Sequence, residues 1–291
     1  MKTKLLAIAL GLAACVAQAA PSFSFSNVPA GWDGAFSIKL TGFENFSNGL
    51  NNGSQNYGVL KVTSIQTIGF GEVTIWADGQ NGAEITGAFS GITVANFDAA
   101  GPGGFLYATG GSVDLFINPV GSLVAAGGFS QGLGGYAAAG GGCALNQNCY
   151  HGVSDVGAGG LLLSADYVPG ADVTDDPLVN TVVGLLSAAN PLRGSAQGYL
   201  AVTGGSAADI FDTNGFIGGT ADLNANNTFC TVGTPACATF AQAGGTPASG
   251  GWQLKIDDPV VGSVKLPEPA SLALVGGALL GLGLIRRRKS A

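Results

Sequence analysis

Basic and titratable side chains are scarce in this sequence of 291 residues. It contains 11 Lys and Arg together and one His, and 10% of its residues are charged. The formal net charge of −7 at pH 7 makes the surface repel nucleic acid and anionic lipid. His151 is the only histidine, so it is the only candidate for a histidine base that would activate a serine nucleophile.

The few basic residues are also unevenly placed. Six of the 11 lie near the ends, namely Lys2, Lys4, Arg286, Arg287, Arg288 and Lys289, which leaves five for the rest of the chain against 18 acidic residues. The central part is therefore strongly acidic, and we expect it to attract divalent cations weakly.

Alternation of apolar and polar residues is the strongest pattern that is present. Phe36, Ile38 and Leu40 alternate with polar neighbours, as expected of a strand with one buried face. Glycine-containing turn signals separate the segments of this kind. The predicted strands are residues 36–41, 57–68, 72–76, 83–94, 113–118, 160–168, 195–203 and 252–257. This predicts an all-β fold, an antiparallel β-sandwich or a related barrel with Gly-rich loops.

One further segment of the middle and the domain boundaries are interpreted less directly. Asp176 as N-cap and Pro177 at the first helical position favour a helix that reaches Ala188, but a buried strand would give the same apolar run. The sequence leaves both readings open. We expect residues 20–258 to form an extracellular β-rich body, of one large or two packed domains, and residues 259–266 to be a linker.

The N-terminal residues 1–19 have the features of a signal peptide. A charged start with Lys2 and Lys4 precedes an apolar stretch, and Ala17-Gln18-Ala19 is an A-x-A cleavage site with cutting expected before Ala20. The stretch that ends at Cys15 also fits a lipobox, which would attach a lipid to that cysteine. Both readings predict export.

The C-terminal residues have three parts in a fixed order. Pro267-Glu268-Pro269 comes first, residues 270–285 are uncharged and apolar, and a basic cluster, Arg286, Arg287, Arg288 and Lys289, follows. The apolar part is short for a transmembrane helix, but arginine side chains that reach back to the interface would close the gap. We expect the basic cluster to stay cytoplasmic as a membrane stop.

This tail, residues 267–291, resembles the PEP-CTERM sorting domain, which has also been labelled an ice-binding protein C-terminal domain, a name that implies no ice binding. The resemblance covers under a tenth of the chain. It implies a substrate of exosortase, a protease-like membrane enzyme, and cleavage near Pro267, Glu268 and Pro269. It also implies a Gram-negative bacterium that makes exopolysaccharide, and a protein that is transiently anchored and then reaches the cell surface or the extracellular space.

Cysteine spacing agrees with an oxidising compartment. Beyond Cys15, four cysteines form two local pairs in the sequence, and four cysteines allow three pairings. Short-range closure is favoured because each pair brackets a polar loop. The disulfide candidates are Cys143 with Cys149 and Cys230 with Cys237.

Signals for catalysis and for metals are weak. Residues 128–132 match the GxSxG pattern around Ser130, but a glycine-rich segment follows and is a poor helix start. We therefore predict no enzyme. Asp222, Asn224 and Asn226, with Asp212 nearby, begin like a calcium loop, but the pattern then fails at Asn227 and Gly233. Turn formation is the favoured role for these residues, so no cofactor is expected beyond weak calcium binding.

The functional hypothesis follows from the two ends. We expect an exported, non-enzymatic protein with a structural or adhesive role in exopolysaccharide, biofilm or floc. The alternative is a carbohydrate-binding module that would use exposed aromatic rings, with Trp32, Trp76 and Tyr107 as candidates. A secreted hydrolase is the third class considered.

Overall fold

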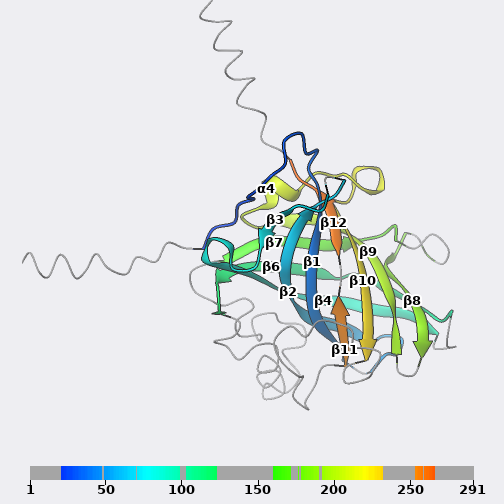
Figure 1. Cartoon of the computed structure of the whole chain (residues 1–291). Coiled ribbons are helices and arrows are strands. Elements are labelled where there is room, and N and C mark those ends of the chain that lie inside the picture. The colour runs from blue at the N-terminus through cyan, green and yellow to red at the C-terminus, as the bar shows by residue number, and fades with distance from the viewer. Residues whose placement is uncertain are drawn as a thin grey trace, which may run out of the picture.

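The computed structural model describes residues 21–47, 49–69, 71–98, 103–122, 160–171, 176, 178–189, 192–231, 253–257 and 259–265 (Figure 1). Their fold is antiparallel β-sheet with three short helical turns. The elements are β1 (Ala35–Phe46), β2 (Gln55–Thr67), β3 (Thr74–Ala77), η1 (Gln80–Gly82), β4 (Ala83–Asp98), β5 (Phe105–Thr109), β6 (Ser112–Pro119), β7 (Gly160–Val168), β8 (Asn180–Ala189), β9 (Leu192–Gly204), α4 (Ala208–Phe211), η3 (Ile217–Gly219), β10 (Leu223–Thr231), β11 (Leu254–Asp257) and β12 (Val260–Ser263). The all-β prediction is confirmed.

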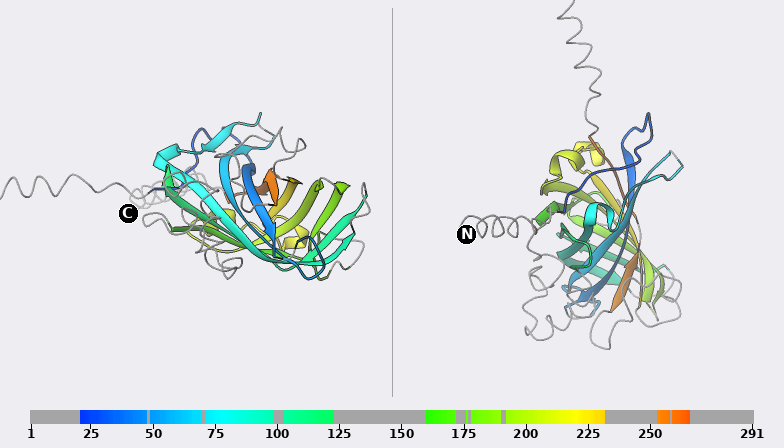
Figure 2. Two further views of the ribbon diagram at one scale, coloured as in Figure 1. Left: turned by 90° about the horizontal axis from the view of Figure 1, so that it is seen from below. Right: turned by 60° about the vertical axis from the view of Figure 1, so that its left-hand side comes forward.

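The twelve strands belong to one sheet, and strand pairing leads around it in a closed circuit. From β1 the hydrogen bonds continue through β2, β4, β6, β7 and β9 to β10. β10 then pairs with β11 and β12, and both of these pair with β1. The sheet therefore has an inside and an outside, as the two views of Figure 2 show.

Two long strands change partners partway, and β5 and β8 fill the space where they part. Residues 83–90 of β4 pair with β6 and residues 93–98 pair with β5, while β9 pairs first with β8 and then with β7. The change in β4 coincides with a register shift against β2 and with Gly91, whose φ is +76°. An extra residue in the left-handed region bends a strand at such a bulge.

Alternating side chains fill the inside of the sheet. Ile38 and Leu40 of β1 lie opposite Ile65 and Val62 of β2, and all four side chains are buried. The same alternation continues through the neighbouring strands, so the core lies within the closed sheet. Burial of this apolar surface is the main stabilising term of the fold.

Several glycines on this inner face make room for large side chains of the neighbouring strands. A Cβ atom on Gly58 would lie 2.5 Å from the Phe89 ring, and one on Gly198 would lie 2.6 Å from the Tyr167 ring. Aromatic rings therefore lie directly over glycine backbone. Part of the high glycine content serves packing, because a larger residue at these positions would displace a ring.

An aromatic plug closes one end of the sheet. It consists of five rings from the N-terminal segment, the start of β1 and α4, with the ring centroids of Phe36 and Phe211 5.4 Å apart. Its members are Phe23, Phe25, Trp32, Phe36 and Phe211. Phe211 and Phe36 are fully buried, so the plug is part of the core.

Both ends of the described body meet at this plug. The N-terminal segment contributes Phe23 and Phe25, and the Lys265 N–H donates to the Ile210 carbonyl at 2.8 Å. Lys265 Nζ also lies 3.8 Å from Asp212 Oδ2. The body therefore extends to Lys265. The predicted linker 259–266 is wrong over residues 260–263, because β12 pairs there with β1 and β10.

The structure decides most of the other expectations. Each of the eight predicted strands overlaps an observed one, and the open segment before Pro191 is the strand β8 rather than a helix. β5, β10 and β12 were not predicted as strands. The described part of the chain contains no helix of membrane-spanning length and hydropathy. The predicted transmembrane segment 270–285 and the signal peptide 1–19 lie outside the described residues.

We predict that Phe211→Ala lowers the free energy of unfolding by about 3–5 kcal/mol, because it removes the ring on which the plug packs and leaves a cavity. Urea denaturation of the purified protein measures this. Leu185→Ala is the control, since Leu185 is 60% exposed and its truncation should change stability by less than about 0.5 kcal/mol. Equal effects of the two substitutions would contradict the importance of the plug.

Candidate functional site

The inside of the sheet is not completely filled. It contains a cavity of about 110 Å³ to which every strand except β3 contributes, and aliphatic and aromatic side chains make up most of its wall. Apolar cavities of roughly this size, about 150 Å³, take up molecules such as benzene. The cavity is therefore large enough for a small organic molecule.

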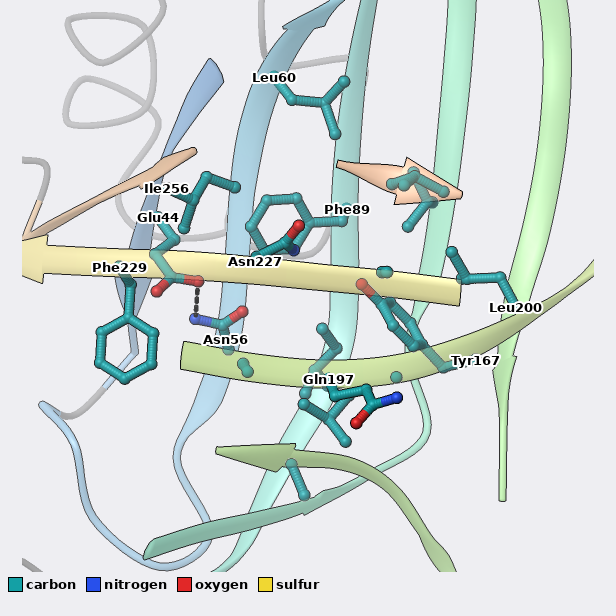
Figure 3. A pocket seen from close by; sticks show the side chains of 18 of the residues that line it. Glu44, Asn56, Leu60, Phe89, Tyr167, Gln197, Leu200, Asn227, Phe229 and Ile256 are labelled. Atoms are coloured by element: carbon teal, nitrogen blue, oxygen red, sulfur yellow. Dashed lines mark hydrogen bonds between the residues drawn. The ribbon is translucent and has the colours of Figure 1, made fainter. Parts of the chain in front are cut away.

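Five polar side chains interrupt the apolar wall, Gln197 and four others. We call Glu44 of β1, Asn56 of β2, Tyr167 of β7 and Asn227 of β10 the polar cluster (Figure 3). Strand register explains why they face inward: Glu44 lies opposite Gly58 and Leu254, and Asn227 lies opposite Ala196, at positions that line the cavity or lie on the inner face. Residues far apart in the sequence thus border one cavity inside the closed sheet.

Glu44 is the central group of the cluster. Asn56 Nδ2 donates a hydrogen bond of 3.0 Å to Glu44 Oε2. The residues described around the cavity include no Lys, Arg or His. Burial therefore raises the pKa of Glu44 from 4.5 to about 7, and the bond from Asn56 offsets only part of this rise.

Tyr167 responds to the same surroundings. Burial raises the pKa of its phenol strongly, and the negative charge of Glu44 raises this pKa further. The hydroxyl is therefore neutral at all relevant pH values and can both donate and accept a hydrogen bond.

The cluster contains polar atoms that find no partner among the described residues. Asn227 Oδ1 is buried without a hydrogen bond, and the Asn56 bond is the one found for Glu44. Gln197 also borders the cavity, but its Nε2 reaches Asn224 Oδ1 at 3.5 Å. An unpartnered buried acceptor costs about 1–3 kcal/mol. The arrangement is suited to hold a polar group that donates hydrogen bonds.

The predicted calcium residues take other roles. Asn224 and Asn226 lie within strand β10, not in a loop. Asp222 is buried, and its carboxylate accepts three backbone N–H bonds, from Val202 at 2.7 Å, Thr213 at 2.6 Å and Asn214 at 2.5 Å.

The expectation that Asp222 begins a calcium loop is therefore corrected, because backbone donors occupy its carboxylate and the following residues pair as a strand. Asp212 Oδ1 accepts from Asn214 Nδ2 at 2.8 Å. In the described ranges no three His, Cys, Asp or Glu side chains are grouped to hold a metal ion. Weak calcium binding elsewhere stays a prediction.

Two of the three aromatic candidates for sugar binding are buried. Trp76 is 0% exposed, which corrects the expectation that it faces solvent, and Trp32 is 4% exposed and donates from Nε1 to the Ala35 carbonyl at 2.7 Å. β3 is covered on both faces, since Ile75 is also buried. Tyr107 is half-buried, and its ring centroid lies 4.9 Å from that of Phe105.

Other predicted residues lie outside the described part. Cys230 lies buried on β10, and its predicted partner is not described, so the pairing stays a prediction. The remaining candidates beyond the described residues are Cys15, Ser130, Cys143, Cys149, His151, Cys237, Pro267, Glu268, Pro269, Arg286, Arg287, Arg288 and Lys289.

Sequence reasoning missed the polar cluster. One signal for Glu44 was available, because it continues the alternation of Phe36, Ile38 and Leu40 onto the face that those residues bury. An acidic residue at such a position is unusual. No comparable signal marks Asn56, Tyr167 or Asn227, which are placed by pairing between distant strands.

Comparisons with known proteins gave no match among family models, curated proteins or solved structures.

We predict that Glu44 makes stability fall with pH. The folded state keeps the Glu44 proton to about pH 7, whereas the unfolded chain loses it near 4.5. The free energy of unfolding therefore decreases as the pH rises between these values, by about 3 kcal/mol in all. Glu44→Gln should match the unchanged protein near pH 4 and exceed its stability by about this amount at pH 8.

Urea unfolding at several pH values measures the difference between the two proteins. Glu72→Gln makes the same charge change at an exposed residue and should leave the pH dependence unaltered. A constant difference between Glu44→Gln and the unchanged protein over the whole range would contradict the raised pKa.

Proposed function

We propose that this chain is an exported, non-enzymatic protein of a Gram-negative bacterium, sorted by an exosortase-type enzyme to the cell surface or the extracellular matrix. The single observation that carries the proposal is the sequence of the tail. Pro267-Glu268-Pro269 is followed by an apolar segment and then by the basic cluster Arg286–Lys289. Such a tail would hold the protein at the membrane until it is cut.

The architecture of the body supports display from one end. The N-terminal segment and Lys265 both contact the region of α4. Both ends of the described body therefore lie at the same end of the closed sheet. A single residue, Leu266, separates Lys265 from the sorting motif. A tether at the aromatic plug leaves the opposite end of the sheet free to meet a matrix or a neighbouring cell.

The acidic body and its single closed sheet fit a structural or adhesive role in exopolysaccharide, biofilm or floc. A rigid scaffold of this kind presents loops without needing chemistry of its own. Weakly bound calcium between acidic chains would contribute to such contacts. We do not assign an enzyme activity, because Ser130 stands in a glycine-rich sequence that is a poor start for the helix of a nucleophile elbow.

Carbohydrate binding is the alternative function. Its structural support is now the half-buried pair of Phe105 and Tyr107 on β5, beside exposed Leu185 of β8. If the pair binds sugar faces, Tyr107→Ala should abolish glycan binding by the secreted protein on a glycan array. Retention of a glycan by Tyr107→Ala would assign that binding to another surface.

The sorting proposal predicts the mass of the secreted protein. Intact mass spectrometry should find a chain that begins at Ala20 and lacks everything from about Pro269 onward. A double substitution, Pro267→Ala with Pro269→Ala, should leave the tail attached and the protein in the membrane fraction, because the cut site loses its extended backbone.

Pro259→Ala, which changes a proline just ahead of β12, is the matched control and should be cut normally. Secreted protein that still carries the Arg286–Lys289 cluster would refute the proposal.

A further inference from the structure

We propose that the cavity inside the closed sheet is a binding site for a small apolar amine. The ammonium group of the guest would donate hydrogen bonds to Glu44 and Asn227, and its hydrocarbon part would contact the aliphatic wall. This site is independent of the sorting proposal, since it depends on the body alone.

The wall of the cavity indicates an apolar guest. Side chains such as Leu60, Phe89, Leu115 and Leu200 surround the space, and ligand sites are usually concave, mostly apolar and supplied with few polar groups. A small hydrocarbon ring fits about 110 Å³. A peptide or an oligosaccharide does not fit a space of this size.

The polar cluster indicates a guest that donates hydrogen bonds. Asn227 Oδ1 is a buried acceptor without a partner, and Glu44 presents a second carboxylate oxygen beyond the one that accepts from Asn56. The Tyr167 hydroxyl can accept as well. An ammonium group has three N–H donors, and the acceptors that border the cavity come from three different strands, β1, β7 and β10 (Figure 3).

The charge of the cluster favours an amine over an alcohol. Glu44 and Tyr167 are the only titratable side chains among the residues described around the cavity, and the others are apolar or carry amides. A buried carboxylate without a cation is costly, and a cationic guest compensates it. A neutral alcohol would leave that charge uncompensated, and a fatty acid would add a second negative charge.

A role in stability alone does not explain Glu44. An apolar residue of similar volume in this position would remove the cost of burying a carboxyl group. The interior thus gives up stability for a charged group, as binding sites commonly do. Its raised pKa is the expected property of a carboxyl group that lacks its cationic partner.

Three probes of one shape test the proposal by calorimetry on the secreted protein. Benzylamine carries the ammonium group, benzyl alcohol replaces it with a neutral donor, and toluene has no polar group. At about pH 8, where Glu44 is ionised, benzylamine should bind at least about tenfold more tightly than either other probe. At about pH 5, where Glu44 is protonated, this preference should largely disappear.

Glu44→Gln keeps the size of the side chain and removes its charge. Its affinity for benzylamine at about pH 8 should fall about tenfold, to the level of benzyl alcohol, while toluene binds as before. Glu72→Gln, which changes an exposed carboxylate, should alter none of the three affinities.

Equal affinities of the three probes, or no binding of any probe, would overturn the proposal. So would unchanged benzylamine affinity in Glu44→Gln. If that variant does not fold, the comparison of the two pH values on the unchanged protein gives the same decision. NMR contacts between the benzyl ring and the methyl groups of Leu60 and Leu200 should place the guest inside the sheet, and contacts confined to surface residues would also refute the site.

Discussion

Closure of the sheet by its last two strands is the constraint on which the rest of the structure depends. β11 and β12 lie in one line between β1 and β10, with β12 against the first half of β1 and β11 against the second. Without them β1 and β10 would be open edges, and the inner face would lose its boundary. The core, the cavity and the polar cluster exist because this line is in place.

The two ends of the closed sheet differ. One end is filled with aromatic side chains, and the other contains the cavity with its polar cluster. At one end the aromatic rings of the plug pack closely, and Phe36 and Phe211 are almost completely buried. Further along β1, the Glu44 side chain borders the cavity. Large rings laid over glycines keep the strands close together there. The result is a rigid wall around an incompletely filled interior.

Local patterns predicted the strands well, because a half-buried strand carries its own period of two. They failed where tertiary contacts decide. β12 is only four residues long, and its sequence predicted a linker. Its pairing with β1 and β10, which the local sequence does not reveal, makes it a strand. Trp76 was a candidate for an exposed ring, but β3 is covered on both faces and the ring is buried. The polar cluster depends on register between distant strands. Of its four residues, only Glu44 could have been recognised from its neighbours in the sequence.

The pairing of Ala35 with Ser263 also sets an order of events. These partners are separated by nearly the whole body, so contact between them requires that almost all of it has already been synthesised. Until then the edge of β1 stays available to any other strand nearby. Long-range closure of this kind is slow compared with the pairing of neighbouring hairpins. A chain held back at its C-terminal end would therefore gain time to find its own last strand before meeting another copy.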